Sequence, residues 1–200
     1  MTKGIFDIYI MKVPDGMIAE DIYPAERREY ILSSSSDKTR LQRYGAWKAL
    51  EKAINDSFGL QITDINFHYI DGKWQSDRLY FSLSHTDSAV AVAVSSNKCG
   101  IDIEAISRFI KRYNSSEILK KFEKKICSEK ENLSLDSPRD FIELWTKKES
   151  IYKCYGSGAF SAKSINTQNY KTVTESITLD EEFIISCCGD NIENYRIFII

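Results

Sequence analysis

The sequence predicts an α+β protein whose elements follow the order β-α-β-β-β and then β-α-α-β-β-β. Three observations support this prediction: stretches that alternate apolar and polar residues, two longer stretches with helical periodicity, and glycine-containing turns between them. A seam near residue 98 divides the 200 residues into two halves, each about the size of a small domain. This order is compatible with a duplicated α+β fold.

The first half begins with a strand and continues with a long helix. Residues 4–13 alternate well enough for a strand, and a Pro-Asp-Gly turn closes it. Pro24 is suited to open a helix, and the run of serines at 33–36 is typical of a loop. The long helix is predicted over residues 37–58.

Three features define this helix. Ser36 or Asp37 can cap its start, and Gly59 can end it. Gly45 inside the helix costs about 1 kcal/mol relative to alanine, which indicates that something packs closely there. The apolar positions that repeat at helical spacing are Leu41, Tyr44, Trp47, Leu50, Ile54 and Phe58.

Residues 65–104 are predicted to form a β meander with glycine-containing turns. The predicted strands are 65–70, 79–84, 89–94 and 100–104. Residues 89–94 alternate alanine with valine, so both faces of that strand are apolar and the strand is expected inside a sheet.

The second half is predicted to hold helices followed by strands. Residues 119–125 are helical in character, and Ser137-Pro138 is a well-formed helix start. That helix is expected to run over 138–155 and to end at Gly156 or Gly158. Residues 165–200 alternate as three or four strands.

Composition excludes several classes of protein. The chain has 27 basic and 29 acidic residues, a net charge of −2, which argues against a protein that coats nucleic acid. The apolar stretch 88–94 is far shorter than the roughly 20 residues that span a bilayer. Asp7 interrupts the apolar N-terminal stretch, so no secretory signal is expected and the prediction is a cytoplasmic protein without membrane contact.

Cysteine usage agrees with a reducing compartment. The five cysteines are odd in number and show no CxxC spacing, and the two histidines leave few ligands for a zinc site. Buried thiols are therefore expected, and a vicinal redox pair of Cys187 and Cys188 is the alternative.

Two segments carry candidate catalytic residues. In the strand GIDIE, Asp102 and Glu104 point to the face opposite the isoleucines, about 6.5–7 Å apart, which suits one hard cation. In WTKKESIYK, Glu149 and Lys153 lie one helical turn apart beside a row of aromatic residues, which indicates a cleft wall. The alternatives are a solvated acidic face and a surface ion pair contributing about 0.2–0.5 kcal/mol.

Two further residues are candidates for binding phosphate. His85 ends the strand FSLSH and is followed by Thr86. It is interpreted either as a structural histidine or as a donor to phosphate. Lys73 follows an Asp-Gly turn and offers a point charge for phosphate if it faces the same cleft.

The order and spacing of these motifs resemble the 4′-phosphopantetheinyl transferases, specifically the subclass that activates surfactin synthetase. That family carries an SH element, a G-[IV]-D-[IL]-E strand and a W-x-x-K-E-[SA]-x-x-K helix, and this chain contains all three. His85 precedes Asp102 by 17 positions. The resemblance covers residues 72–158 well, fits 24–43 more loosely, and extends to the final 40 residues only as strands.

The resemblance implies two similar α/β lobes, 1–98 and 99–200, related by a pseudo-two-fold axis, with the active site in the cleft between them. It implies a monomeric enzyme that moves the phosphopantetheine arm of coenzyme A onto a serine of an apo acyl or peptidyl carrier protein and releases adenosine 3′,5′-bisphosphate. Another Mg²⁺-dependent phosphotransferase or nuclease, and a non-catalytic carrier-binding homologue, are the alternatives.

The resemblance also implies residue roles. Asp102, Glu104 and Glu149 would hold Mg²⁺, an ion that binds through a few carboxylates plus phosphate and water. Glu149 or a metal-held water would take the serine proton, and Glu131 is a further candidate base. Lys153 would offset the charge of the leaving group.

Coenzyme A contacts are implied in both halves. The phosphate-binding candidates are Lys73, Ser84, His85 and Lys148, with helix support as a second role for Lys148. The nucleotide contacts would come from the Arg27/Arg28 segment and from Arg40 or Arg43. The carrier protein is expected to dock as an acidic helix, with the basic stretch 118–126 as the best candidate surface and an ordinary solvated helix as the alternative.

Overall fold

The computed structural model describes residues 4–112, 115–131 and 133–200. The chain divides into two compact units, the first made of residues up to Lys98 together with Glu193–Ile200, the second of Cys99–Ile192. Both units contain helices and strands, which confirms the predicted α+β class. None of the helices in the described part of the chain is both long enough and apolar enough to cross a membrane.

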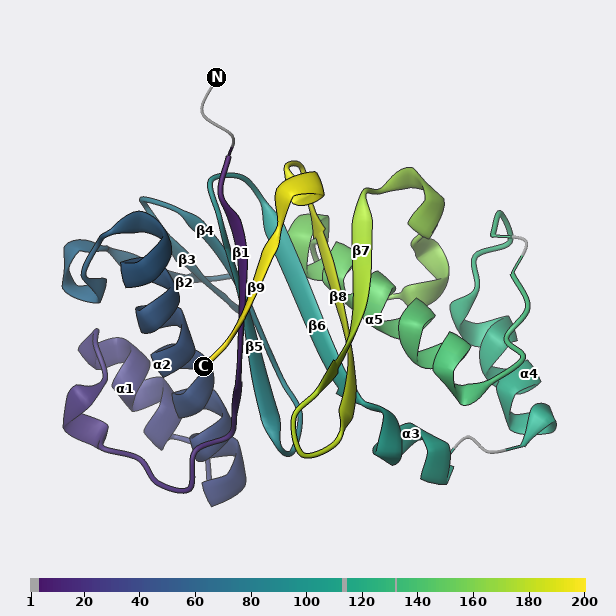
Figure 1. The fold of residues 1–200 in the computed structure, drawn as a ribbon, viewed down its shortest axis with the longest axis horizontal. Coiled ribbons are helices and arrows are strands. Elements are labelled where there is room, and N and C mark those ends of the chain that lie inside the picture. Colours follow the sequence, from purple (N-terminus) through teal and green to yellow (C-terminus); the bar gives the residue numbers. More distant parts are fainter. Residues whose placement is uncertain (1–3, 113–114, 132) are drawn as a thin grey trace. The chain divides into compact units, whose positions relative to one another are not determined.

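The sheet of the first unit has four strands in the order β4-β5-β1-β9 (Figure 1). The strands are β1 (Phe6–Lys12), β4 (Tyr80–His85), β5 (Ala89–Ser95) and β9 (Arg196–Ile199). β1 pairs antiparallel with β5 and parallel with β9. Every residue of β5 is buried, which confirms the interior strand predicted from its two apolar faces.

Two helices belong to this unit, α1 (Ala25–Leu32) and α2 (Asp37–Phe58), and α2 packs against the sheet (Figure 1). The hydroxyl of Ser36 caps α2 by accepting from the Thr39 N–H at 3.3 Å, and Gly59 ends the helix in the left-handed conformation. A Cβ atom on Gly45 would lie 2.7 Å from Cδ of Pro14. The close packing predicted at this glycine is therefore confirmed.

The predicted meander over residues 65–104 is correct for its two central strands, because β4 pairs antiparallel with β5, but it is wrong for the strands before and after them. β2 (Phe67–Ile70) pairs with β3 (Lys73–Ser76), a strand that the sequence reading missed, and the two form a separate sheet. The next strand, β6 (Cys99–Ala105), lies in the second unit and pairs with β8. Alternation predicts that a strand exists, but it does not identify the partner strand.

The second unit has a three-stranded sheet in the order β6-β8-β7 (Figure 1). The remaining strands are β7 (Thr172–Thr178) and β8 (Glu182–Gly189), and the helices are α3 (Ile106–Arg112), α4 (Ser116–Ile126) and α5 (Pro138–Tyr155). Short 3₁₀ turns lie at Ala19–Asp21, Ile62–Asp64, Ala162–Ser164, Thr167–Asn169 and Ile192–Asn194.

The last strand differs from the predicted lobe assignment, which placed all of 99–200 in the second lobe. β9 pairs with β1, so Glu193–Ile200 belong to the first unit. Arg196 donates from its guanidinium to both carboxylate oxygens of the buried Asp7, at 2.8 and 2.6 Å, and Ser57 donates to the same carboxylate. This network ties the C-terminal strand to the first strand and to α2.

Candidate active site

The acidic strand β6 lies at one edge of the second sheet, and the face with its two carboxylates is turned toward α5. Asp102 pairs with Ser186 of β8 and Glu104 pairs with Ile184, so these side chains share one face of the sheet. Asp102 is only 5% exposed. The alternative of a solvated acidic face therefore does not hold for Asp102.

Gly100 lets α5 approach β6 closely. A Cβ atom at this position would collide with the backbone oxygen of Ser150 and would lie 2.7 Å from the backbone nitrogen of Cys154. The missing side chain therefore allows the last turns of α5 to pack directly on the backbone of β6. The same turns carry Glu149 and Lys153.

Both the start of α5 and its contact with β8 are fixed by hydrogen bonds. Ser137 Oγ accepts from the Asp140 N–H, and the Asp140 carboxylate accepts from the Ser137 N–H, a capping box that confirms the predicted helix start. Further along, Thr146 Oγ1 lies 2.8 Å from Ser186 Oγ, which lies 2.9 Å from Thr174 Oγ1. These hydroxyls hold α5 in register with β8 and β7.

An ion pair joins the two candidate segments. Lys153 Nζ donates to Asp102 Oδ1 at 2.7 Å, and the lysine side chain retains 23% exposure. The pair brings a residue from α5 onto the carboxylate of β6, as the juxtaposition of the two motifs predicts.

The other two carboxylates are electrostatically coupled to Asp102. Burial, and then the negative charge of Asp102, raise the pKa of Glu104 to about 7. Burial and Asp102 also raise the pKa of Glu149, while Lys153 opposes this rise. The positive charges that oppose this repulsion come from Lys153 and, at Glu104, from Arg108. Three partly or fully buried carboxylates with these two countercharges favour an additional cation.

The carboxylates do not form a closed metal cluster as they stand. Within the described ranges of the chain, no three histidine, cysteine or acidic side chains converge closely enough to hold an ion. The ammonium of Lys153 lies on Asp102, where a cation would otherwise be attracted. The chemistry of the donor set nevertheless fits Mg²⁺, which needs only one or two protein carboxylates when phosphate and water complete its shell.

Glu131 does not have the geometry expected of a general base. It is buried, and its Oε2 accepts from Lys148 Nζ at 2.6 Å and from the Ser128 N–H at 2.8 Å. Its Oε1 accepts from both the N–H and the hydroxyl of Thr167, each at 2.7 Å. Burial raises the pKa of Glu131, but these hydrogen bonds outweigh burial and leave the pKa below its ordinary value. Such a carboxylate is a weak base.

Lys148 is not placed to contact phosphate. Its side chain is fully buried, and Nζ donates to Glu131 and to the backbone oxygens of Ala162 and Ile165. The second role given to Lys148, support of the helix, agrees with this geometry. Helical spacing alone does not reveal this, because the partners lie in irregular segments far along the chain.

Protonation of Glu131 is expected to destabilise the protein at acid pH. Because the pKa of Glu131 is lower in the folded state, the ionised carboxylate stabilises the fold above its unfolded pKa of about 4.3. This stabilisation is lost as the pH falls through the lower folded value. Denaturant unfolding is measured between about pH 7 and pH 3. As the pH falls, the free energy of unfolding is expected to decrease more steeply in the wild type than in Glu131→Gln. Parallel curves would contradict this contribution.

The phosphate candidates His85, Ser84 and Lys73 lie in the first unit. His85 ends β4 and is exposed, Ser84 is buried, and Lys73 begins β3. The amide of the buried Gln42 donates to the backbone oxygen of Thr86 at 2.6 Å. Gln42 therefore fixes the end of the strand that carries His85. Sequence reading missed it, because a polar residue in a helix gives no sign of burial.

The arginines of the first unit have different environments. Arg27 is 4% exposed, and its guanidinium lies 4.4 Å from the ring centre of Trp47 and 5.4 Å from that of Trp74. This burial speaks against Arg27 as a nucleotide ligand. Arg43 donates to the backbone oxygen of Tyr30 and remains half-buried, whereas Arg40 pairs with Asp37 at the surface.

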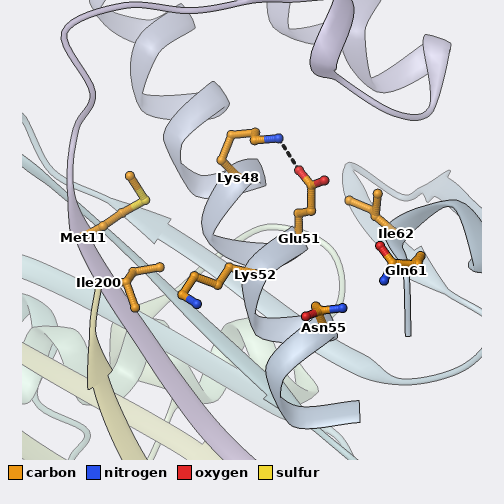
Figure 2. Close-up of a pocket in the computed structure, with 8 residues that line it drawn as sticks. All are labelled: Met11, Lys48, Glu51, Lys52, Asn55, Gln61, Ile62 and Ile200. Atoms are coloured by element: carbon orange, nitrogen blue, oxygen red, sulfur yellow. Dashed lines mark hydrogen bonds and ion pairs between the residues drawn. The ribbon is translucent and has the colours of Figure 1, made fainter. Parts of the chain in front are cut away.

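A groove of about 790 Å³ lies on the first unit but contains none of the predicted site residues (Figure 2). Its basic side chains are ion-paired: Lys48 with Glu51, and Lys52 with Asp56. Its lining consists of Met11, Lys48, Glu51, Lys52, Asn55, Gln61, Ile62 and Ile200. The groove lacks an uncompensated positive charge that would suit phosphate.

All five cysteines are free thiols; Cys99, Cys187 and Cys188 are buried as predicted, whereas Cys127 and Cys154 are only partly buried. Cys187 and Cys188 are buried, and burial raises the pKa of the Cys187 thiol. A buried thiol with a raised pKa is a poor nucleophile, which disfavours the vicinal redox pair.

Comparison with known proteins identifies the family. Residues 98–200 match the 4′-phosphopantetheinyl transferase superfamily, and the chain belongs to this superfamily. The chain is also 36% identical over 88 residues to the 4′-phosphopantetheinyl transferase gsp of Aneurinibacillus migulanus. That alignment covers 41% of this chain and spans 33%, about a third, of the length of the relative. The resemblance that the motifs predict is therefore confirmed at the level of the family.

Proposed function

We propose that this protein transfers the 4′-phosphopantetheine group of coenzyme A to a serine of an apo carrier protein. One observation carries this proposal: the family match includes β6 and α5, whose Asp102, Glu104 and Glu149 are electrostatically coupled. A coupled set of carboxylates is suited to hold a divalent ion against a diphosphate. The bond to be cleaved lies within the diphosphate of coenzyme A.

In this proposal Asp102, Glu104 and Glu149 hold Mg²⁺. When bound, the ion would neutralise charge on the diphosphate and polarise the phosphorus under attack. Glu149 would take the proton of the carrier serine, because both oxygens of Glu131 already accept hydrogen bonds from Lys148, Ser128 and Thr167. Lys153, which lies on Asp102 in this structure, would offset the charge that develops on the departing phosphate.

The finer features of the proposal follow the family resemblance. We propose that coenzyme A is contacted by His85, Lys73, Arg40 and Arg43. The two units are proposed to be similar lobes, and the enzyme is proposed to be monomeric and cytoplasmic. The carrier protein is proposed to dock on α4, with the acidic side chains of the carrier against the lysines of this helix. The apolar residues Leu119 and Ile126 of that helix are buried in the core, whereas its lysines at 120, 121, 124 and 125 are exposed.

The proposal is tested by incubating the protein with coenzyme A, Mg²⁺ and a panel of apo acyl and peptidyl carriers. The expected result is a mass gain of one phosphopantetheine group on at least one carrier. Nucleic acid cleavage without a mass gain would support a Mg²⁺-dependent nuclease instead. Carrier binding without transfer would identify a non-catalytic homologue.

Replacement of Lys153 by methionine is expected to separate binding from catalysis. Turnover should fall on the order of 10²-fold, because the charge that stabilises the leaving group is lost, whereas the KM for coenzyme A should change little. Without coenzyme A, Mn²⁺ should bind more tightly to this variant, because the ammonium no longer competes for Asp102. Steady-state kinetics and Mn²⁺ titration measure both effects.

Lys147→Met, on the same helix, is the matched control for this variant. A change confined to the KM for coenzyme A would assign Lys153 to substrate binding and contradict its role in the reaction. Unchanged Mn²⁺ affinity would contradict the competition between ammonium and metal.

A further inference from the structure

We propose that Glu131 and Lys148 form a buried positioning pair that fixes the orientation of α5, and that neither residue touches the substrate. The proposal rests on the proposed function, because it concerns how Glu149 and Lys153 are held. It assigns to Glu131 a role other than the general base that the family resemblance implies.

The hydrogen-bonding capacity of both groups is used within the protein. The side chains of Lys148 and Glu131 are 0% exposed, and their charged atoms lie 2.6 Å apart. An ammonium has three N–H donors, and Nζ donates to Glu131, Ala162 O and Ile165 O. The carboxylate accepts from Lys148, Ser128 and Thr167 on its two oxygens. Neither group retains an obvious site for a substrate atom.

The partners of the pair come from segments that pack on α5 away from its sheet contacts. Ser128 follows α4, and Ala162, Ile165 and Thr167 lie in the otherwise irregular stretch before β7 that contains two short 3₁₀ turns. Trp145 and Tyr152 of α5 contact Phe160 in the same stretch, with ring centres 5.6 and 5.2 Å apart. The Lys148 contact therefore lies between two aromatic contacts.

The two sets of contacts together prevent rotation of the helix. Thr146 fixes α5 to β8 through Ser186, and Lys148 fixes it to Glu131 and the irregular stretch. Glu149 follows Lys148 directly, and Lys153 lies on Asp102. A small rotation of α5 would move both side chains away from Asp102, because a helical side chain follows the rotation of its backbone.

A double-mutant cycle tests the pair without reference to activity. Glu131→Gln and Lys148→Met should each lower the midpoint of thermal unfolding, because each leaves one buried charge without its partner. The double variant should unfold at a higher temperature than the additive expectation from the two single variants. Additive losses would overturn the pairing.

The pH dependence and kinetics distinguish positioning from base catalysis. In Glu131→Gln, kcat should fall moderately and the acid limb of its pH profile should remain. Restoration of part of the lost kcat in the double variant would support positioning, because glutamine cannot act as a base. If kcat is lost in Glu131→Gln and is not restored in the double variant, and the acid limb of the pH profile disappears, the proposal is overturned and Glu131 is identified as the base.

Thr167→Val offers a milder variant if Glu131→Gln does not fold. It removes the hydroxyl that donates to Glu131 and keeps the backbone donor. A severalfold loss of kcat without a shift of the pH profile is expected, and an unchanged kcat would contradict positioning through this network. If the wild type transfers nothing to any carrier, the proposed function fails, whereas the unfolding cycle still tests the pair.

Discussion

The Asp102→Asn variant is expected to lose phosphopantetheinyl transfer by on the order of 10³-fold or more, because a metal ligand contributes several kcal/mol to the transition state. Asparagine keeps the shape of the side chain but removes its charge. The buried carboxylate is the partner of Lys153 and the group to which Glu104 and Glu149 are coupled. The rate is measured as mass gain on an apo carrier at saturating Mg²⁺.

Circular dichroism and thermal unfolding show whether this variant remains folded. Glu143→Gln is the control, since Glu143 is a carboxylate of the same unit that lies on α5, outside the acidic strand β6, and pairs with Arg139 at the surface. The control is expected to keep nearly full activity. Near-wild-type turnover in Asp102→Asn would contradict the assignment of this carboxylate to the metal.

The Gly100→Ala variant is expected to destabilise the second unit by about 3 kcal/mol, in the upper range of overpacking costs. The new Cβ atom would collide with the backbone of Ser150 and Cys154, which cannot rotate away as a flexible side chain can. α5 must therefore move off β6. Because Glu149 and Lys153 move with α5, transfer activity should fall together with stability.

Denaturant unfolding measures this loss, and Gly16→Ala serves as the control. An added Cβ atom at Gly16 meets no atom within 4 Å, so its effect on the free energy of unfolding should be small. Equal stability of the two variants would show that α5 does not depend on close contact with β6.

Local signals in the sequence predict the two long helices well. Ser36 and Gly59 mark both ends of α2, and the Ser137 capping box marks the start of α5. These features act within one turn of the chain, so they can be recognised without knowledge of the fold. The same holds for the alternation that places Asp102 and Glu104 on one face.

Non-local partners could not be predicted in this way. The pairing of β9 with β1 depends on residues at opposite ends of the chain, and strand sequence carries little information about the partner. The burial of Arg27 among aromatic rings, and of Lys148 beside Glu131, likewise depends on distant segments. A charged residue is usually exposed, and the family resemblance implied a ligand contact for Arg27 and either a phosphate contact or helix support for Lys148.

Titration of the protein with Mn²⁺, followed by electron paramagnetic resonance with and without coenzyme A, tests most directly whether Asp102, Glu104 and Glu149 share one divalent ion. We expect a single site whose affinity for Mn²⁺ falls at least tenfold, on the order of 1.4 kcal/mol, when any one of these residues is replaced by its amide. The affinity should be unaffected in Glu143→Gln. Binding of Mn²⁺ with equal affinity to the wild type and to all three amide variants would contradict a metal site shared by these carboxylates.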